Sequence, residues 1–487
     1  MAAFLISPLA ACLVLAASTA LARRAWLNRL AGLIAGAVIL ASGLAIAAAV
    51  LSDGPLTAMG GLLRADALTA FMLVVVGAVG VTATWGSLAS RGSTRAGAIA
   101  YPALVVAFLF AMTLAVLADN LGILWVALEA TTIATAFLVG HYRTRTSLEA
   151  AWKYVVLGSV GVAIALLGIV LLYAATVQAG QPTLSWASLA RDGLDLDPGL
   201  VGIAAGLTLL GFATKAGLAP MHSWLPDAHS QAPAAVSGLM SGVLLAVAFY
   251  GILRIQAITD LIIGPGLMRG LLIAGGLLSI AEAGALILRQ RDLKRLLAYS
   301  SIEHMGIIAL AAAIGGPLAI SAALLHMLGH GLAKSSTFVV SGRILDVEGT
   351  AQISRIHGLL ARRPGVAIPF LAGTAALLGM PPFVLFFTEV AIVIAGFQRG
   401  LGWVMAVAIV LLLVAFVGIA RHASDMSFGT GRDDDARTGS AEDRDRSWHG
   451  PAAPIALALL AAVVIGLLAG PLSTLLAEAA AALGGVR

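Results

Sequence analysis

Long apolar runs recur along almost the whole chain and are separated by short polar connections. Each run has close to the roughly 20 residues that a helix needs to cross the hydrocarbon core of a bilayer. Because lipid offers the backbone no hydrogen-bond partners, we expect each run to be a helix. The pattern predicts an all-α integral membrane protein of about fourteen transmembrane helices, at 1–21, 27–51, 65–89, 97–118, 120–140, 151–176, 200–220, 233–258, 267–288, 295–315, 317–341, 366–398, 402–421 and 453–480.

Prolines interrupt two of these segments. The seventh ends at Pro220 and is followed by a polar stretch that contains Pro226 and Pro233. The twelfth carries the sequence GMPP at 379–382 in its interior. Because proline removes a backbone donor and clashes with the preceding turn, we expect helices seven and twelve to be broken.

Composition supports a membrane protein and narrows its chemistry. Of the 487 residues, 60% are apolar and 11% are charged, too few polar residues to cover a soluble protein of this length. The single cysteine, Cys12, excludes a disulfide framework and an iron–sulfur cluster held by this chain alone. No nucleotide-binding glycine motif, nucleophile triad or compact metal-ligand spacing appears, so we expect no catalytic residue, no metal site and no cofactor on the chain itself.

The basic residues predict how the chain is oriented. The odd-numbered connections hold 21 of the 29 Lys and Arg residues, and the even-numbered connections hold five, Arg254 among them. By the positive-inside rule the odd connections are cytoplasmic, so both termini lie on the non-cytoplasmic side of a bacterial-type inner membrane. The polar stretch 422–452 is then a solvated cytoplasmic loop.

Charged residues inside the apolar segments require an explanation, because each costs at least ~2.5 kcal/mol at mid-membrane. Glu129, Lys215, Lys334 and Glu389 lie well inside their segments. His326, His330 and Lys334 recur at i, i+4 and i+8, which places them on one face of a helix. Further candidates for proton relay are His222, His229, Glu282, Glu303 and His304.

Two interpretations fit these charges. Each could be a buried polar group paired with a neighbour to hold helices together. The whole set, with both signs and histidines between them, favours proton transfer instead. Burial disfavours the charged form of Lys or Glu, whereas a nearby opposite charge favours it, so a Lys whose distance to a Glu changes is a switchable proton site. Histidines can relay protons between such sites.

The broken helices strengthen the second interpretation. Lys215 lies five residues before Pro220, and Glu389 lies seven residues after Pro382. One charge precedes its break and the other follows it, as expected of two helices related by an inverted repeat. Transporters commonly place ion sites at such discontinuous helices.

The sequence resembles the antiporter-like membrane subunits shared by respiratory complex I, multisubunit cation/proton antiporters and group 4 [NiFe] hydrogenases. The matching stretches are NLGILWVALEATTIATAFLVG at 120–140, GFATKAGLAPMHSWLPDAHSQAP at 211–233, RDLKRLLAYSSIEHMG at 291–306, HMLGHGLAKSSTF at 326–338 and GMPPFVLFFTE at 379–389. Within the family, SSIEHMG and EAAWKY at 149–154 are most similar to hydrogenase-4 component F.

The resemblance implies a role for each matching residue. Glu129 corresponds to the glutamate of the fifth helix, which tunes the lysine of the seventh helix, here Lys215. His326, His330 and Lys334 correspond to the central relay of the second half-channel. Glu389 corresponds to the terminal residue of the broken twelfth helix, where protons are released or taken up.

The resemblance also implies an organisation for the chain and reveals one departure. We expect three N-terminal helices in 1–96, a first half-channel repeat in 97–258, an inverted second repeat in 259–421, the polar loop 422–452 and a last helix in 453–487. Many members carry a lysine in the eighth helix where this chain has Ala246. Because a methyl group holds no proton, water or the histidines at 222 and 229 would have to bridge the gap, or pumping is altered.

The resemblance implies a proton-translocating subunit of a hydrogenase-4-like or formate-hydrogenlyase-like complex. Its partners would be other membrane subunits and a peripheral redox arm that carries the NiFe centre and iron–sulfur clusters. Alternatives are a subunit of a cation/proton antiporter or of a complex I-type NADH–quinone oxidoreductase, and, from another class, a membrane scaffold that has lost transport. The basic residues lie in short connections between apolar runs and are explained as topology signals, so we expect no nucleic-acid partner.

Overall fold

The computed structural model describes residues 2–22, 24–89, 100–191, 195–429, 452–468 and 470–483. Arg91, Arg95 and most of the predicted polar loop 422–452 lie outside these ranges. The long helices are α1 (Ala2–Ala22), α2 (Ala25–Asp53), α3 (Ala67–Gly86), α4 (Ala100–Leu117), α5 (Leu121–Val139), α6 (Arg145–Gln178), α8 (Pro198–Ala216), α11 (Leu245–Ile263), α12 (Gly266–Ile287), α13 (Leu293–Ile314), α14 (Gly316–Glu348), α16 (Pro364–Leu377), α17 (Val384–Gln398), α18 (Gly402–Phe428), α20 (Ala452–Leu467) and α21 (Gly470–Ala481).

Short elements connect the long helices. They are the antiparallel strands β1 (Leu56–Ala58) and β2 (Leu63–Ala65), the helices α7 (Trp186–Arg191), α9 (Trp224–Gln231), α10 (Ala234–Leu239) and α15 (Leu359–Arg362), the 3-10 turns η1 (Met59–Gly61), η2 (Ser87–Ala89), η4 (Gly140–Tyr142) and η6 (Ile353–Arg355), and the π-helical turn η5 (Met240–Leu244). Together α10, η5 and α11 form one continuous span, Ala234–Ile263.

The number of spans agrees with the predicted pattern to within one or two. Twelve helices of the described chain are long and apolar enough to cross a membrane, or thirteen if the bent pair α20 and α21 is one span. The predicted fourteenth is reached only if the shorter helices α16 and α17 cross the membrane together. The all-helical membrane fold is therefore confirmed, whereas the exact count of fourteen and the inverted repeats stay predictions.

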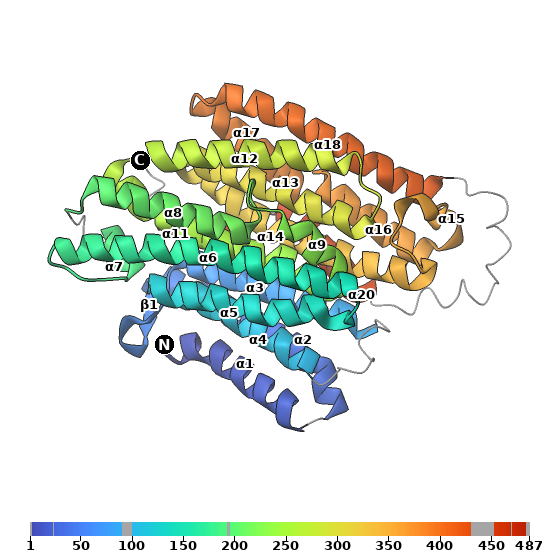
Figure 1. Cartoon of the computed structure of the whole chain (residues 1–487), viewed down its shortest axis with the longest axis horizontal. Helices are drawn as coiled ribbons and strands as arrows, with labels where there is room; N and C mark the ends of the chain where they lie inside the picture. Colours follow the sequence, from blue (N-terminus) through green and yellow to red (C-terminus); the bar gives the residue numbers. More distant parts are fainter. Residues whose placement is uncertain are drawn as a thin grey trace.

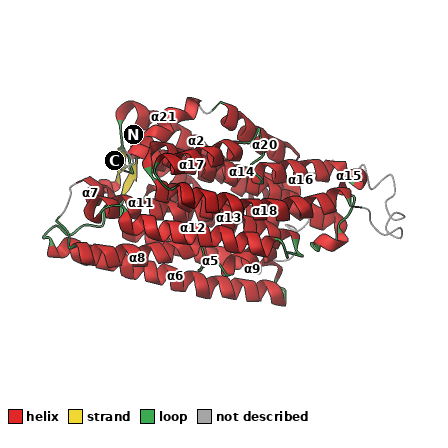
Figure 2. Cartoon of the chain, turned by 90° about the horizontal axis from the view of Figure 1, so that it is seen from above, coloured by secondary structure: helices red, strands yellow, loops and turns green. Residues whose placement is uncertain are grey.

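The helices lie side by side along the long axis of the molecule (Figure 1). The beginning of α1, the strand β1 and helix α7 lie at one end, and α15 lies at the opposite end (Figure 1). Figure 2 shows that almost all of the ribbon is helical, with the strand pair at the end where the chain begins. The even-numbered connections that hold β1 and α7 thus lie opposite the odd-numbered connection that holds α15.

Central and peripheral helices differ sharply in burial. The most apolar stretch of the span Ala234–Ile263 is completely buried within the chain, whereas only 28% of that of α1 is. Helix α14 packs against α3, α10, α13, α16 and α17. The predicted relay residues of α14 therefore lie in the interior of the bundle, where lipid does not reach them.

Local sequence explains where the helices begin and end. Asp66 and Asn120 accept backbone N–H groups at the first turns of α3 and α5, at 2.9 and 2.8 Å, which satisfies donors that a helix leaves free. Helix α8 ends at Ala216, because Gly217 adopts the left-handed conformation that favours glycine. The seventh segment therefore stops four residues before Pro220, the residue expected to end it.

Candidate functional site

The first buried lysine lies in the last turn of α8. Lys215 is fully buried, and its Nζ donates to Thr132 Oγ1 of α5 at 2.5 Å and to Tyr154 OH of α6 at 3.2 Å. Gly158 of α6 provides the space, since a Cβ there would come within 3.3 Å of Nζ. An ammonium group this far from water is thus held by two hydroxyl groups.

Glu129 lies on the far side of the same hydroxyl. Thr132 Oγ1 donates to Glu129 Oε2 at 3.1 Å, and Ser159 Oγ donates to Oε1 at 2.7 Å. Within the described chain, Glu129 and Lys215 form no direct ion pair. Because a hydroxyl group both donates and accepts, Thr132 connects the predicted pair through one intervening oxygen.

The second cluster follows one face of α14, as the spacing predicts. His326, His330 and Lys334 are all buried, and the ring of His304 from α13 lies 5.2 and 4.9 Å from those of His326 and His330. The ammonium of Lys334 donates to the carbonyl of Leu297 at 2.7 Å and to the hydroxyl of Ser300. The structure therefore brings His304, a secondary candidate, into the centre of the predicted relay.

Two carboxylates complete the second cluster. Glu303 of α13 is buried and interacts electrostatically with both Lys334 and Glu389. Glu389 follows the break between α16 and α17, as predicted. Gly379 in that break has φ +59°, and a Cβ there would lie 2.5 Å from Glu389 Oε2, so the loop closes over the carboxylate only because this residue is glycine.

The two candidate bridging histidines have different surroundings. His229 of α9 is fully buried, packs between the rings of Trp224 and Phe338, and interacts electrostatically with Lys334 and His330. The Trp224 ring in turn contacts Tyr154, a partner of Lys215. His229 therefore lies on the side of α9 that faces the second cluster.

His222 points elsewhere. Its Nε2 lies 3.3 Å from Glu282 Oε2 of α12, and the Glu282 side chain is 37% exposed. This pair lies at the outer face of the bundle. The structure thus separates two histidines that the sequence could not distinguish.

The turn of the helix that precedes Ala246 contains a polar contact. Ala246 is buried in α11 just after the π-helical turn η5. Within that turn Ser241 is hydrogen-bonded to Ser301 of α13, the neighbour of Ser300, at 2.8 Å. The helix that lacks the lysine is therefore joined by a hydroxyl group to α13, the helix that also contacts Lys334 through Ser300.

One buried ion pair was missed by the sequence interpretation. Arg254, which was assigned to an even-numbered connection, lies inside α11 and is 2% exposed. Its guanidinium donates to both oxygens of Asp66 at 2.8 and 2.7 Å and stacks over Trp186 at 3.6 Å. The position of Arg254 inside an apolar run could have indicated a buried charge. An arginine near the end of a span, however, is also typical of the basic residues that set topology.

The structure brings together three possible metal ligands that the sequence does not group, while the expected absence of a metal site stays a prediction. His304, His326 and Glu389 each offer one ligand atom, and these atoms lie within 4.8 Å of one another. The ligands come from α13, α14 and α17, so no short spacing in the sequence could indicate them.

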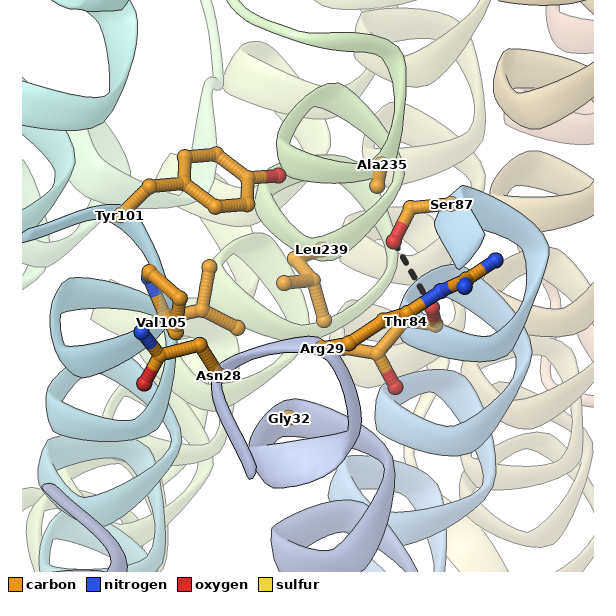
Figure 3. A pocket seen from close by; sticks show the side chains of 10 residues that line it. Asn28, Arg29, Gly32, Thr84, Ser87, Tyr101, Val105, Ala235 and Leu239 are labelled. Carbon is orange, nitrogen blue, oxygen red and sulfur yellow. Dashed lines mark hydrogen bonds between the residues drawn. The ribbon is translucent and has the colours of Figure 1, made fainter. Parts of the chain in front are cut away.

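A small pocket lies apart from both charge clusters. It encloses about 40 Å³ between α2, α3, α4 and α10, with Asn28, Arg29, Thr84 and Tyr101 among its lining residues (Figure 3). Arg29 donates to the carbonyl of Leu88 at 3.1 Å. A pocket of this size holds a few water molecules at most.

Known proteins place this geometry in context. Residues 118–415 match the family model described as NADH:quinone oxidoreductase/Mrp antiporter, transmembrane. A hydrogenase-4 component F homolog from Methylacidiphilum infernorum is 40% identical over 344 residues, 69% of this chain and 71% of the relative. NADH-quinone oxidoreductase subunit N from Deinococcus radiodurans is 33% identical over 424 residues, 85% of this chain and 82% of the relative.

A solved structure extends the match to almost the whole chain. A chain of the membrane-bound sulfane sulfur reductase, an archaeal respiratory membrane complex, superimposes with a TM-score of 0.87 at 26% identity. The match covers 99% of this chain and 97% of that chain. The chain therefore belongs to the NADH:quinone oxidoreductase/Mrp antiporter family of transmembrane subunits.

Proposed function

We propose that this chain is the proton-translocating membrane subunit of a redox-driven complex of the hydrogenase-4 type. The observation that carries the proposal is the pair of fully buried lysines, Lys215 and Lys334, each held by hydroxyl groups within reach of a carboxylate. A structural ion pair needs no such spacing. A proton site benefits from it, because a small movement changes the interaction between the two charges.

The proposed path begins at the first lysine. Glu129 and Lys215 interact through the Thr132 hydroxyl. A shift of α5 relative to α8 therefore strengthens or weakens the attraction between the carboxylate and the ammonium group. When the carboxylate interaction weakens, desolvation favours the neutral amine and the proton leaves. In the proposed path it leaves by way of the Tyr154 hydroxyl, whose oxygen lies 3.2 Å from Nζ.

His229 is the proposed link across the gap left by Ala246. It lies between Trp224, beside the first cluster, and Lys334 in the second. From Lys334 the proton passes along His330, His304 and His326 toward Glu389 at the broken helix. Histidine suits this role because its ring binds a proton at one nitrogen and releases one from the other.

The partner complex is inferred from similarity. The 40% identity to a hydrogenase-4 component F homolog favours a group 4 hydrogenase, whose peripheral arm would carry the NiFe centre and iron–sulfur clusters. The longer match to an NADH-quinone oxidoreductase subunit N supports a quinone-reducing complex as second candidate. We place the complex in a bacterial inner membrane, with the odd-numbered connections on the cytoplasmic side.

The test is proton uptake by sealed inverted vesicles that contain the assembled complex, driven by H₂ with a viologen acceptor. Lys215→Met and Glu389→Gln should abolish most acidification while viologen reduction continues. Lys153→Met is the matched control, because Lys153 is an exposed lysine paired with Glu149 and Asp227. His229→Gln should reduce pumping more than His222→Gln.

Two results separate the alternatives. Acidification changes evoked by NaCl without H₂ would assign the chain to an antiporter instead. Unchanged pumping by intact complexes of Lys215→Met and Glu389→Gln would show that the chain is a scaffold.

A further inference from the structure

Three side chains that are distant in the sequence converge where α13, α14 and α17 meet. His304, His326 and Glu389 each place a potential ligand atom within 4.8 Å of the other two. The two imidazoles are closer still, with His304 Nδ1 at 3.1 Å from His326 Nε2. Two nitrogens bound to one tetrahedral Zn²⁺ at 2.0–2.1 Å stand about 3.3 Å apart, so the observed spacing requires almost no rearrangement.

A hydrogen bond already orients one of the ligands. The hydroxyl of Thr388 donates its only proton to the carbonyl of Leu385 at 2.9 Å. Its contact with His326 Nδ1, also at 2.9 Å, therefore has the ring N–H as donor. In neutral His326 this leaves the lone pair on Nε2, facing His304. Metal-binding histidines typically have such an outer hydrogen bond, which fixes their tautomer.

The third ligand lies under a partly exposed loop. Glu389 is half-buried, and the loop over it, residues 379–383, includes Met380, which is 43% exposed. Glu303 lies within electrostatic range of Glu389. A second carboxylate nearby favours a divalent cation, whereas Lys334, which interacts electrostatically with Glu303 and His304, opposes it.

We propose that His304, His326 and Glu389 form a binding site for Zn²⁺ or a similar divalent transition metal, and that its occupation blocks proton transfer. Two imidazoles and one carboxylate are the donors of many zinc sites with an open fourth position. A bound metal occupies the nitrogen lone pairs that would otherwise accept a proton. The inhibition of proton transfer rests on the proposed function, whereas the binding of the metal does not.

Binding is tested on the purified complex after treatment with a chelator. Equilibrium dialysis against ZnCl₂, followed by elemental analysis, should find one more zinc per wild-type complex than in His304→Gln. Thr388→Val keeps all three ligands but removes the outer hydrogen bond, so it should weaken zinc affinity about 10–100-fold. His422→Gln is the control, because His422 lies on α18 outside the cluster and its Nε2 contacts the Ile287 carbonyl of α12.

Inhibition is measured separately, as the zinc concentration that halves H₂-driven acidification. It should rise in Thr388→Val in parallel with the loss of affinity and stay unchanged in His422→Gln. Equal zinc binding by the wild type and both cluster variants would overturn the site. Binding that leaves wild-type pumping intact would overturn the block alone, and a wild type that binds zinc without pumping would refute only the proposed function.

Discussion

Neutral oxygens, rather than opposite charges, are the direct partners of Lys215 and Lys334. Lys215 contacts the hydroxyl groups of Thr132 and Tyr154, and Lys334 contacts the hydroxyl of Ser300 and the carbonyl of Leu297. The charged residues could be predicted from the sequence, because a charge in an apolar run is costly and therefore conspicuous. Thr132 could not, since threonine is common in membrane helices and usually bonds its own helix backbone.

Thr132 provides the prediction at this scale. Thr132→Val has nearly the same shape but removes the hydroxyl between Glu129 and Lys215. We expect proton pumping to slow about tenfold, which corresponds to about 1.4 kcal/mol in the barrier. Acidification rates in inverted vesicles check this, and Thr132→Ser, which restores a hydroxyl, should recover most of the rate. Equal rates in the valine and serine variants would argue that the hydroxyl has no part in transfer.

At the scale of elements, apolar length and proline positions predict the helices well. The breaks after α8 and between α16 and α17 lie where the prolines indicate, although Gly217 rather than Pro220 ends α8. What could not be predicted is which helices approach each other. The His304–His326–Glu389 cluster and the position of His229 depend on the packing of α9, α13, α14 and α17, which leaves no periodic signal in one sequence.

The ion pair between α3 and α11 allows a prediction about elements. Arg254→Met leaves the Asp66 carboxylate buried without its partner, which should cost about 3–5 kcal/mol of unfolding free energy. Adding Asp66→Asn should recover much of this loss, because asparagine still caps α3 and carries no charge. Unfolding of the purified complex in detergent measures both, with Arg269→Met as a control for a partly exposed arginine. An additive double variant would contradict a direct pairing.

At the scale of the whole molecule, the two ends of the bundle carry different connections. The beginning of α1, β1 and α7 lie together, opposite α15 (Figure 1). These connections, which the alternation of basic residues assigns to opposite sides, thus lie at opposite ends, while the side that faces the cytoplasm stays a prediction. Because Arg254 lies in a helix, the even-numbered connections have one basic residue fewer than was counted. The excess of basic residues in the odd-numbered connections therefore increases, and the predicted orientation is unchanged.

Orientation is tested with introduced cysteines. The natural Cys12 is fully buried, so it gives little background in this chain. Thr57→Cys in β1 should react with a membrane-impermeant maleimide applied to intact spheroplasts, whereas Ser354→Cys in η6 should react only in inverted vesicles. Labelling is read on the isolated chain after denaturation. The reverse pattern would place both termini in the cytoplasm.

The π-helical turn η5 has a consequence for how this helix tolerates insertions and deletions. A π turn holds one residue more than an α turn, so it rotates everything after it by about 100° relative to everything before it. Ser241 within the turn contacts Ser301, and Arg254 beyond it contacts Asp66. A single-residue deletion in 240–244 would rotate the two parts of the helix relative to each other. One of the two contacts could then form only if the other were lost. The wide turn thus fixes the angle around the helix axis between Ser241 and Arg254. We therefore expect substitutions in this turn to be tolerated better than a change in its length.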